Sequence, residues 1–477
     1  MLFRYHELVM QWNAFHIAAG LALTLSPLPG QTKGEVTVWL TNPDKSALFA
    51  RQDSTLRFSK STNSNPTIDV DDKQKFQSMD GFGFALTGGS AQHLIRMEPA
   101  KRAAILREIF STVGNGIGVS YLRLSIGASD LNDHVFSYDD LAADETDPKL
   151  AHFSLDPDRA DVIPVMKEIL AIDPKIKILG SPWSAPAWMK SNNAVKGGHL
   201  KPEYYEVYAD YFVRYIDGMK AEGIAIDAIT IQNEPLNEKN TPSMQMLAPD
   251  QATFLKTALG PAFRRAGIKT KIVLYDHNCD VPEYANSILS DPDAARYVDG
   301  SGFHLYGGKI EAMTQVHDAH PAKNLYFTEQ MVTGSVESRP AINLISPVRR
   351  LIVGATRNWS RNVLLWNLAA DPKNQPHTDN GGCGMCQGAI TIDGDTVSRN
   401  LAYYAVAHAS KFVRPGSVRI GSNDLETLPN VAFKTADGHN VLIVANGGQS
   451  SQTFGIRYRG KLATATLGAG AVATYVW

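Results

Sequence analysis

Cysteine is scarce in this sequence, and clusters of basic residues are missing. The three cysteines, Cys279, Cys383 and Cys386, are too few for a disulfide framework or for a four-cysteine zinc site. Lysine and arginine number 46 against 48 aspartates and glutamates, and they form no basic run. A charge balance of this kind creates no field that would attract nucleic acid. We therefore expect no nucleic-acid partner and a neutral substrate rather than a polyanion.

Two common catalytic signatures and a metal-ligand cluster are also absent. The pair Gly81 and Gly83 is not followed by the third glycine of a dinucleotide-binding fingerprint. No G-x-S-x-G elbow of a serine hydrolase occurs, and no dense group of histidines and aspartates indicates a metal centre. The sequence therefore predicts a protein that needs neither a metal ion nor an organic cofactor.

Long apolar runs are confined to the N-terminus. Residues 14–28 are mostly apolar, and they lie between Arg4 and the pair Pro29-Gly30. This pattern predicts a signal segment within residues 1–30 and a secreted or periplasmic location. No other segment approaches the roughly 20 apolar residues of a membrane-spanning helix. We therefore expect no integral membrane span.

Cys383 and Cys386 are separated by two residues within a glycine-rich segment, residues 379–388. Such a segment favours a loop over a strand or helix. Two interpretations are open for this pair. It forms a small disulfide that stiffens the loop, or it remains as two free thiols.

Residues 73–411 alternate short apolar or β-branched runs with longer segments of helical period, which is typical of repeated βα units. One of the helical segments, 202–220, places its aromatic residues on one face and has Pro202 at its start. Eight strands separated by helices predict a closed (β/α)8 TIM barrel. The eight expected strands are 78–86, 119–127, 176–183, 228–235, 271–277, 300–306, 324–330 and 362–368.

The two ends of the chain have a different pattern. Residues 31–72 and 412–477 contain β-rich runs such as 35–39, 441–445 and 471–477, separated by glycine, asparagine, aspartate and serine turns. A chain of 477 residues also exceeds what one hydrophobic core usually serves. We therefore expect an α/β protein with one discontinuous β-sandwich, built from both chain ends, beside the barrel.

Two glutamates end strands of the predicted barrel. Glu234 follows Asn233 at the end of the fourth strand, and Glu329 ends the seventh. Barrel enzymes carry their active sites at the carboxyl ends of the strands, where these two acids would face each other. Hydrolysis of a glycosidic bond needs such a pair, and their separation distinguishes retention, at about 5–5.5 Å, from inversion, at about 6.5–9.5 Å. The sequence leaves this separation open.

Other polar and aromatic residues accompany these acids at the strand ends. Tryptophan rings at a barrel mouth can stack on the faces of sugar rings, although each could instead pack in a capping loop. Histidine, tyrosine, arginine and aspartate can bind hydroxyl groups or hold a carboxylate, although salt bridges at the barrel rim are an alternative. These candidates are Arg123, Asp130, Trp183, His304, Tyr306 and Trp366.

The assembled motifs resemble glycoside hydrolase family 30, the family of glucosylceramidases and microbial β-1,6-glucanases. The resemblance runs from about Gly81 to the C-terminus, through Asp80-Gly81-Phe82-Gly83, Leu122-Arg123-Leu124-Ser125-Ile126, Ser181-Pro182-Trp183, Asn233-Glu234-Pro235, Phe303-His304-Leu305-Tyr306, Phe327-Thr328-Glu329 and Leu365-Trp366-Asn367-Leu368. It implies a retaining mechanism with Glu234 as acid/base and Glu329 as nucleophile. It also implies glucose contacts at Asp130, Trp183, Asn233 and Trp366, with His304 and Tyr306 near the nucleophile and Arg123 behind the pair.

The substrate follows less directly from the resemblance. The segment after Thr87 lacks the acid that animal glucosylceramidases carry there, and the Cys383/Cys386 loop is similar to the bacterial β-1,6-glucanase branch. We therefore expect a β-linked glucan, hydrolysed as by a β-1,6-glucanase, rather than glucosylceramide, the glycolipid alternative. A non-catalytic carbohydrate-binding barrel and a metal-dependent barrel hydrolase are more remote alternatives.

Overall fold

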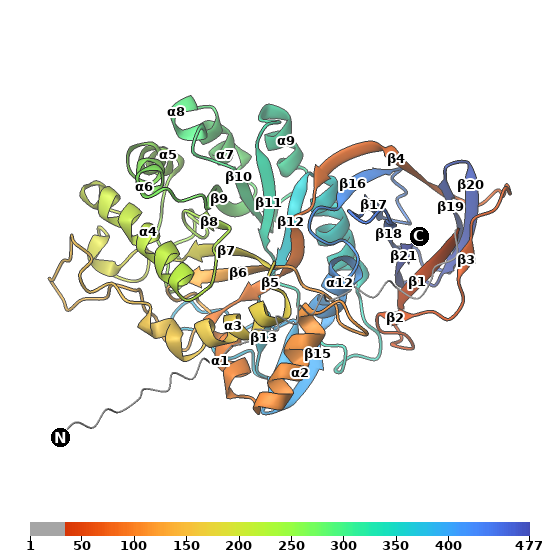
Figure 1. Ribbon diagram of the computed structural model, residues 1–477, viewed down its shortest axis with the longest axis horizontal. Coiled ribbons are helices and arrows are strands. Elements are labelled where there is room, and N and C mark those ends of the chain that lie inside the picture. The colour runs from red at the N-terminus through yellow and green to blue at the C-terminus, as the bar shows by residue number, and fades with distance from the viewer. Residues whose placement is uncertain (1–33) are drawn as a thin grey trace, which may run out of the picture.

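The computed structural model of the protein describes residues 34–477, and the signal segment predicted within residues 1–30 lies outside them. Its centre is a closed barrel of eight parallel strands, in the order expected from the sequence (Figure 1). The eight strands are β5 (Gly81–Leu86), β6 (Tyr121–Ile126), β7 (Lys177–Pro182), β8 (Ala228–Thr230), β9 (Lys271–Cys279), β10 (Gly300–Gly308), β11 (Asn324–Glu329) and β12 (Ser360–Leu365). The prediction of a TIM barrel is therefore confirmed.

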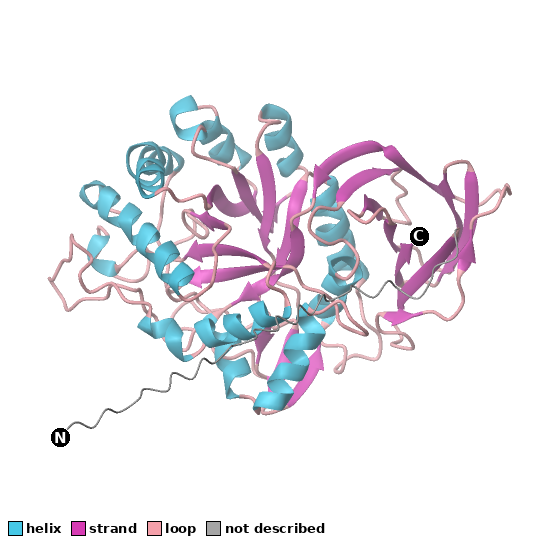
Figure 2. Ribbon diagram, viewed as in Figure 1, coloured by secondary structure: helices cyan, strands magenta, loops and turns pink. Residues whose placement is uncertain are grey.

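Helices surround this barrel on its outer side (Figure 2). The aromatic segment predicted at 202–220 begins with a 3-10 turn and continues as an α-helix whose tyrosines Tyr208, Tyr211 and Tyr215 are fully buried. The helices and helical turns are α1 (Gly88–Arg96), α2 (Pro99–Phe110), η1 (Asp156–Ala160), α3 (Val162–Ile172), η2 (Ala187–Met189), η3 (Pro202–Tyr204), α4 (Tyr205–Ala221), α5 (Ala248–Phe254), η4 (Leu255–Leu259), α6 (Gly260–Ala266), α7 (Pro282–Leu289), α8 (Pro292–Ala295), α9 (Ala312–Ala319), α10 (Ile345–Pro347), η5 (Val348–Val353), α11 (Gly354–Arg357) and α12 (Leu401–Ser410).

The barrel interior has an apolar layer at its amino-terminal end. This layer consists of Tyr121, Leu179, Ala228, Val273, Tyr326 and Leu364, one from each of six strands. Side chains two residues apart on a strand point to the same face. Arg123, Ser181 and Thr328 therefore lie one step above this layer, inside the barrel, and they are buried there. The apolar layer closes the barrel below a polar layer that faces the mouth.

The chain ends form a second β-structure beside the barrel, as predicted. Its strands follow the order β2-β1-β21-β18-β17-β16-β4-β19-β20, and β3 pairs with β1, so strands from both ends alternate in one sheet system around a separate apolar core. These strands are β1 (Glu35–Thr41), β2 (Ala50–Arg51), β3 (Leu56–Arg57), β4 (Thr67–Ser78), β16 (Val418–Ser422), β17 (Asn430–Lys434), β18 (Asn440–Ala445), β19 (Gln452–Tyr458), β20 (Lys461–Leu467) and β21 (Val472–Val476).

Strand β4 and helix α12 connect the two parts. β4 is paired with β16 as far as Ser78 and leads directly into the first barrel strand, so the domain boundary expected at residue 72 lies within this strand. Every residue of α12 is buried, because the helix packs between barrel and sandwich. Its His408 bonds to Thr41 and Thr474 of the sandwich, both at under 3 Å (2.8 and 2.9 Å). The two parts therefore share buried surface.

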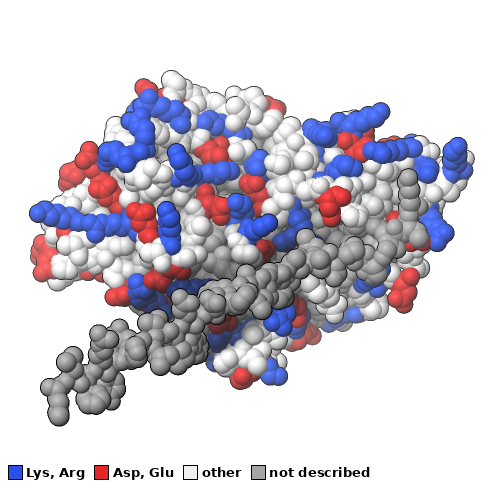
Figure 3. All heavy atoms as spheres, in the orientation of Figure 1, with Lys and Arg blue, Asp and Glu red and all other residues white. Residues whose placement is uncertain are grey.

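The remaining strands form a small sheet after the last barrel strand, with β13 (Ala369–Ala370), β14 (Ile390–Asp393) and β15 (Thr396–Arg399). On the face shown in Figure 3, acidic and basic side chains are interspersed rather than gathered into a patch of one sign. Within residues 34–477, no helix combines the length and the apolar character needed to cross a membrane.

Candidate active site

The two glutamates singled out in the sequence meet at the mouth of the barrel. Glu329 is the last residue of β11. Glu234 lies four residues beyond the end of β8, in a turn where its φ is 45° and its N–H donates to the Asp276 carbonyl at 2.9 Å. One carboxylate oxygen of each glutamate and one His304 nitrogen all lie within 4.8 Å of one another. This short separation matches the spacing of retaining glycosidases rather than the wider gap of inverting ones.

Glu329 is held by a cation and a phenol. Arg123 Nη1 donates to Glu329 Oε2 at 2.5 Å, and the Tyr306 hydroxyl donates to Glu329 Oε1 at 3.0 Å. The Tyr306 oxygen in turn accepts the backbone N–H of Met331 at 3.0 Å. Donors of this kind stabilise the charged form of a carboxylate and leave its orientation little freedom.

Glu234 is held by neutral amides and by an imidazole. Asn237 Nδ2 donates to Glu234 Oε2 at 2.6 Å, and Asn240 Nδ2 approaches the same oxygen at 3.4 Å. Glu234 Oε1 faces His304 Nδ1 at 3.3 Å. No arginine or lysine bonds to Glu234 among the described residues, so the two glutamates differ in their fixed charge partners.

Asp276 is the functional residue that sequence reasoning missed. It follows the fifth strand's apolar run, it is fully buried, and it carries a signal like that of Glu329, an acid at the carboxyl end of a barrel strand. Its carboxylate accepts hydrogen bonds from four side chains: Arg123 Nη2 at 2.8 Å, Ser181 Oγ at 2.7 Å, Thr328 Oγ1 at 2.6 Å and His304 Nε2 at 3.1 Å. The Arg123 and His304 cations and these hydroxyl donors hold the pKa of Asp276 far below its usual range, against the effect of burial.

Arg123 and His304 therefore lie below the two glutamates rather than on the surface of the mouth. The Arg123 side chain has no exposed surface, and its Nη2 also bonds to Asn233 Oδ1 at 2.7 Å. Both terminal nitrogens of Arg123 bond to protein groups, so the side chain lies behind the two acids, as the family resemblance implies, and neither of these nitrogens faces the mouth unpaired. Arg123 connects Glu329, Asp276 and Asn233.

His304 is protonated in this network. Burial alone would lower its pKa, but the carboxylates of Glu329, Asp276 and Glu234 raise the pKa of His304 to about 9. A protonated imidazole donates from both nitrogens and has no lone pair for a metal ion. Glu234, His304 and Glu329 lie close enough to bind a cation, but the imidazolium and the Arg123 ion pair occupy their ligand atoms. This donor set does not suit a metal.

The two glutamates have opposite pKa shifts. Burial raises the pKa of Glu329, and His304 and Arg123 only partly offset this rise. Burial would also raise the pKa of Glu234, but the hydrogen bond and charge of His304, together with Asn237, bring it below its usual range. In the absence of substrate, these shifts favour an ionised Glu234 next to a protonated His304.

Two tryptophans form an apolar wall beside the glutamates. The rings of Trp183 and Trp366 are stacked, with centroids 5.3 Å apart, and the Arg123 guanidinium lies 4.8 Å from the Trp183 ring. Asp130 is buried nearby, and burial together with the charges of Glu329 and Glu234 raises its pKa well above the usual value. Trp188, by contrast, bonds to the Asp139 carbonyl at 3.0 Å and packs in the capping loop.

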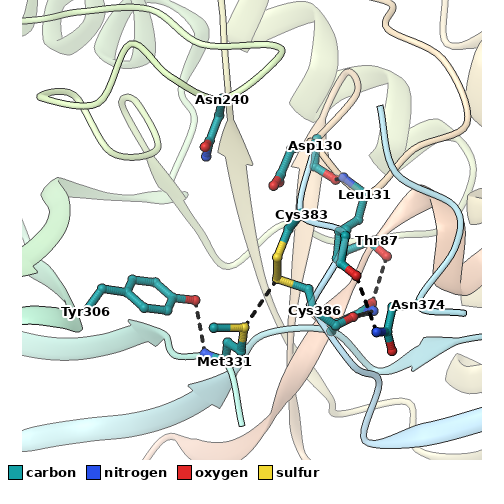
Figure 4. The surroundings of a disulfide bond; sticks show 12 residues. Thr87, Asp130, Leu131, Asn240, Tyr306, Met331, Asn374, Cys383 and Cys386 are labelled. Atoms are coloured by element: carbon teal, nitrogen blue, oxygen red, sulfur yellow. Dashed lines mark hydrogen bonds between the residues drawn. A yellow bond between two sulfur atoms is a disulfide. The ribbon is translucent and has the colours of Figure 1, made fainter. Parts of the chain in front are cut away.

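Cys383 and Cys386 form a disulfide, which decides between the two interpretations left open by the sequence. Figure 4 shows this bond at the barrel mouth, between Asp130 on one side and Met331 and Tyr306 on the other. Cys386 belongs to the same apolar cluster as Trp183 and Trp366. The disulfide is therefore part of the wall of the site.

Changing Asp276 to asparagine is expected to destabilise the barrel by about 3–5 kcal/mol, because the buried Arg123 and His304 cations lose a shared charged acceptor. Differential scanning calorimetry measures the effect as a lower unfolding temperature. A matched control is Asp69→Asn, which removes a half-exposed ion pair with Arg457 at 2.8 Å. The control is expected to cost less than about 1 kcal/mol. Equal effects of the two changes would contradict the structural importance of the Asp276 network.

Comparison with known proteins places this site in a family. Residues 79–413 match the glycosyl hydrolase family 30 TIM-barrel domain, and residues 416–475 match the beta sandwich domain of the same family. An endo-1,6-beta-D-glucanase of Neurospora crassa is 34% identical over 80% of this chain and 81% of its own. Lysosomal acid glucosylceramidase of Mus musculus is 30% identical over 78% of this chain and 76% of its own.

Solved structures agree with this placement. An endo-β1,6-glucanase superposes with a TM-score of 0.85 at 34% identity, covering 93% of this chain and 99% of its own. SrfJ from Salmonella typhimurium superposes with a TM-score of 0.86 at 25% identity, over 93% and 99% of the two chains. The chain belongs to glycosyl hydrolase family 30 and is a retaining glycosidase of that family.

Proposed function

We propose that this protein hydrolyses β-1,6-linked glucan, with Glu329 as the nucleophile and Glu234 as the acid/base. The observation that carries the proposal is the pair of buried carboxylates at the barrel mouth, with oxygens less than 4.8 Å apart and different fixed partners. Arg123 and Tyr306 donate hydrogen bonds that favour the ionised form of Glu329 against the effect of burial, and they fix its orientation, as a nucleophile requires. Glu234 bonds to uncharged amides and to the titratable His304, and His277 also lies near it, so it can gain and lose a proton.

The reaction then proceeds by double displacement. Glu329 attacks the anomeric carbon while Glu234 protonates the leaving oxygen, and a glycosyl ester with Glu329 forms. In the second half, Glu234 removes a proton from water, which attacks the anomeric carbon, and the sugar leaves with its β configuration retained.

His304 supplies the proton with which the first half begins. In the free site Glu234 is ionised and His304 is protonated, whereas the general acid must carry a proton. His304 Nδ1 lies 3.3 Å from Glu234 Oε1, so one transfer along this contact gives a protonated Glu234 and a neutral His304 without changing the net charge. Entry of a neutral sugar removes water from Glu234, which favours its uncharged form.

A sugar is expected to bind next to the tryptophan wall. Trp183 and Trp366 are only 2% and 3% exposed, so they present a small apolar surface to a glucose ring, and Asp130 and Asn233 offer polar groups to its hydroxyls. The side-chain oxygen of Asn233, Oδ1, already accepts a hydrogen bond from Arg123 Nη2. The side-chain amide N–H groups of Asn233 are therefore the ones that can donate to a sugar hydroxyl.

A glucan is favoured over a glycolipid for two reasons. Three fungal endo-1,6-beta-D-glucanases are 31–34% identical to this chain, and the glucosylceramidases of worm and mouse are 26–30% identical. The structure adds a steric observation, because a side chain at Gly88 would overlap the amide of Asn132. The acid that animal glucosylceramidases carry after the threonine corresponding to Thr87 would therefore require the Asn132 side chain to move.

Digestion of a β-1,6-glucan is expected to release β-1,6-linked gluco-oligosaccharides or glucose, while glucosylceramide under matched conditions yields little glucose. Chromatography of the products measures both reactions. Chelator is expected to leave the rate unchanged, since no step uses a metal ion. Release of glucose from the lipid alone would reverse the choice of substrate, and loss of activity with chelator would favour the metal-dependent alternative.

We also propose that the protein works outside the reducing cytoplasm, in a secreted or periplasmic location. The Cys383–Cys386 disulfide supports this location, because such bonds persist mainly in oxidising compartments. Fractionation of producing cells, followed by an assay for aryl β-glucoside hydrolysis, tests it. Activity confined to the cytoplasmic fraction would contradict the proposal.

A further inference from the structure

The disulfide belongs to a long segment without helix or strand, residues 371–388, which we call the disulfide loop. The loop reaches segments that follow three different barrel strands. Its Thr378 donates to the Asp130 carbonyl at 3.0 Å, its Asn380 carbonyl accepts from Thr241 at 2.5 Å, and its Cys386 carbonyl accepts from Asn367 at 3.3 Å. The loop therefore spans the side of the mouth from the Asp130 segment to the end of β12.

The sulfur of Cys386 makes the contact that leads to the nucleophile. Cys386 Sγ lies 3.6 Å from Met331 Sδ, and Cys386 itself is only 4% exposed (Figure 4). Met331 also forms a β-bridge with Trp366, so it is held between the disulfide and the tryptophan wall. Met331 follows Glu329 by two residues, and its N–H donates to the Tyr306 hydroxyl that bonds to Glu329.

We propose that the Cys383–Cys386 disulfide positions Tyr306 on the nucleophile Glu329 by packing against Met331. This inference rests on the proposed function and extends it to two cysteines and a methionine that act on Glu329 through Tyr306. Met331 and the two cysteines are thus positioning residues. An intact disulfide holds Cys386 Sγ in the apolar cluster, and the cluster fixes the Met331 backbone whose N–H orients the Tyr306 hydroxyl.

Reduction of the disulfide would disturb the contact between Cys386 and Met331, because two separate thiols occupy more space than two bonded sulfurs. Two bonded sulfurs become two thiols whose sulfurs must lie at the roughly 3.5–4 Å separation of non-bonded atoms. Cys386 is buried against Met331 and the tryptophans, so the extra space comes from displacing Met331. The Tyr306 hydroxyl then loses its fixed donor and leaves Glu329 with one hydrogen bond fewer.

The sign of the resulting pH effect follows from the hydrogen bond. The Tyr306 hydroxyl donates to the charged form of Glu329, so its loss raises the pKa of that carboxyl. The nucleophile must be ionised in the free enzyme, and therefore the acidic limb of kcat/KM moves to higher pH. The charged and titratable groups that face Glu329 are Arg123 from β6, Asp130 after β6, Glu234 after β8, Asp276 from β9, and His304 and Tyr306 from β10.

The test uses an activated aryl β-glucoside and the double variant Cys383→Ala/Cys386→Ala, which removes the sulfur that packs against Met331 and so leaves the Met331 side chain without that support. The acidic limb of kcat/KM is expected to rise by about one pH unit, the size of shift that one lost hydrogen bond to a carboxylate produces. Tyr306→Phe is expected to move the limb in the same direction. Combining Tyr306→Phe with the double variant is expected to add no further shift, because both changes remove the same hydrogen bond.

Matched variants separate positioning from general damage. Met331→Ala is expected to move the limb, whereas Met331→Leu keeps the apolar contact and leaves it in place. Cys279→Ala, at the free cysteine buried at the end of β9, is expected to leave the limb unchanged. If the double variant fails to fold, the phosphine reductant TCEP applied to the folded Cys279→Ala protein opens the disulfide and gives the same measurement.

An unmoved limb in folded protein without the disulfide would overturn the inference, and so would shifts that simply add to that of Tyr306→Phe. A lower unfolding temperature with an unchanged pH profile would show a merely structural bond and would also overturn it. These outcomes presuppose a parent that hydrolyses the aryl glucoside. A parent inactive on both the aryl glucoside and β-1,6-glucan would contradict the proposed function itself.

Discussion

Replacing Glu329 by glutamine is expected to lower kcat/KM on β-1,6-glucan by about 10⁴-fold or more, the size of loss seen when a covalent nucleophile is removed. The amide keeps the size of the side chain, but it is a poor nucleophile and carries no charge to stabilise the oxocarbenium-like transition state. The loss is expected on an activated aryl β-glucoside as well, because the covalent ester cannot form with any leaving group. Reducing-sugar release and aryl-group absorbance measure the two rates.

The matched control is Glu337→Gln, an exposed acid eight residues further along the chain, in the segment that follows β11. It is expected to keep the parent rate on both substrates. Calorimetry of Glu329→Gln shows whether the buried Arg123 charge, left without its carboxylate, destabilises the barrel. A folded Glu329→Gln protein that hydrolyses the aryl glucoside as fast as the parent would remove Glu329 from the mechanism and favour a different nucleophile.

Replacing Glu234 by glutamine has the second largest expected effect, and its size depends on the leaving group. On β-1,6-glucan the sugar oxygen needs a proton to depart, and loss of general acid catalysis is expected to slow the reaction by about 10²–10⁴-fold. On an aryl glucoside with an acidic phenol, formation of the glycosyl-enzyme needs no such proton and is expected to be nearly normal. The second step still lacks its base, so an initial burst of phenol followed by slow turnover is expected.

Stopped-flow absorbance detects this burst, and the pH profile gives an independent check. The basic limb of kcat/KM reports the group that must be protonated, and it is expected to disappear in Glu234→Gln. Glu238→Gln, at an exposed acid four residues away, is the matched control and is expected to retain both the parent rate and the basic limb. An equal loss on all leaving groups would contradict the acid/base role of Glu234.

Local pattern was sufficient for the architecture. The strand runs alternate with helical segments along the chain, and each expected barrel strand overlaps an observed one. The reason is that the burial of a strand or helix imposes a hydrophobic period on residues that are neighbours in the sequence. The short strand β8 shows the limit of this reasoning. Its regular pairing ends at Thr230, four residues before Glu234. Glu234 lies in a turn and has a positive φ, and hydrophobic periodicity in the sequence does not indicate such a turn.

The positions of the two acids at strand ends were also readable from the sequence, but their partners were not. Glu234 and Glu329 both follow apolar runs, and a closed barrel brings strand ends together at one face. Asp276 carries the same kind of signal on the fifth strand, yet its importance lies in four donors that come from β6, β7, β10 and β11. The convergence of these four donors on one carboxylate depends on the register between strands and on which side chains point into the barrel. Neither property can be predicted from residues that are adjacent in the sequence.

Residue patterns along the chain were enough to predict the class of this protein: a barrel with a sandwich from both chain ends, a pair of acids at the barrel mouth, and a family. Those properties depend on local periodicity and on residues close together in the chain. The tertiary structure added three facts: Cys383 and Cys386 are bonded, Arg123 is fully buried with both terminal nitrogens bonded to protein groups, and Asp276 connects Arg123 with His304. Arg123 lies 153 residues from Asp276 and 206 residues from Glu329, so these contacts exist only once the barrel closes. The two cysteines are three residues apart, but their bonding depends on how the loop folds.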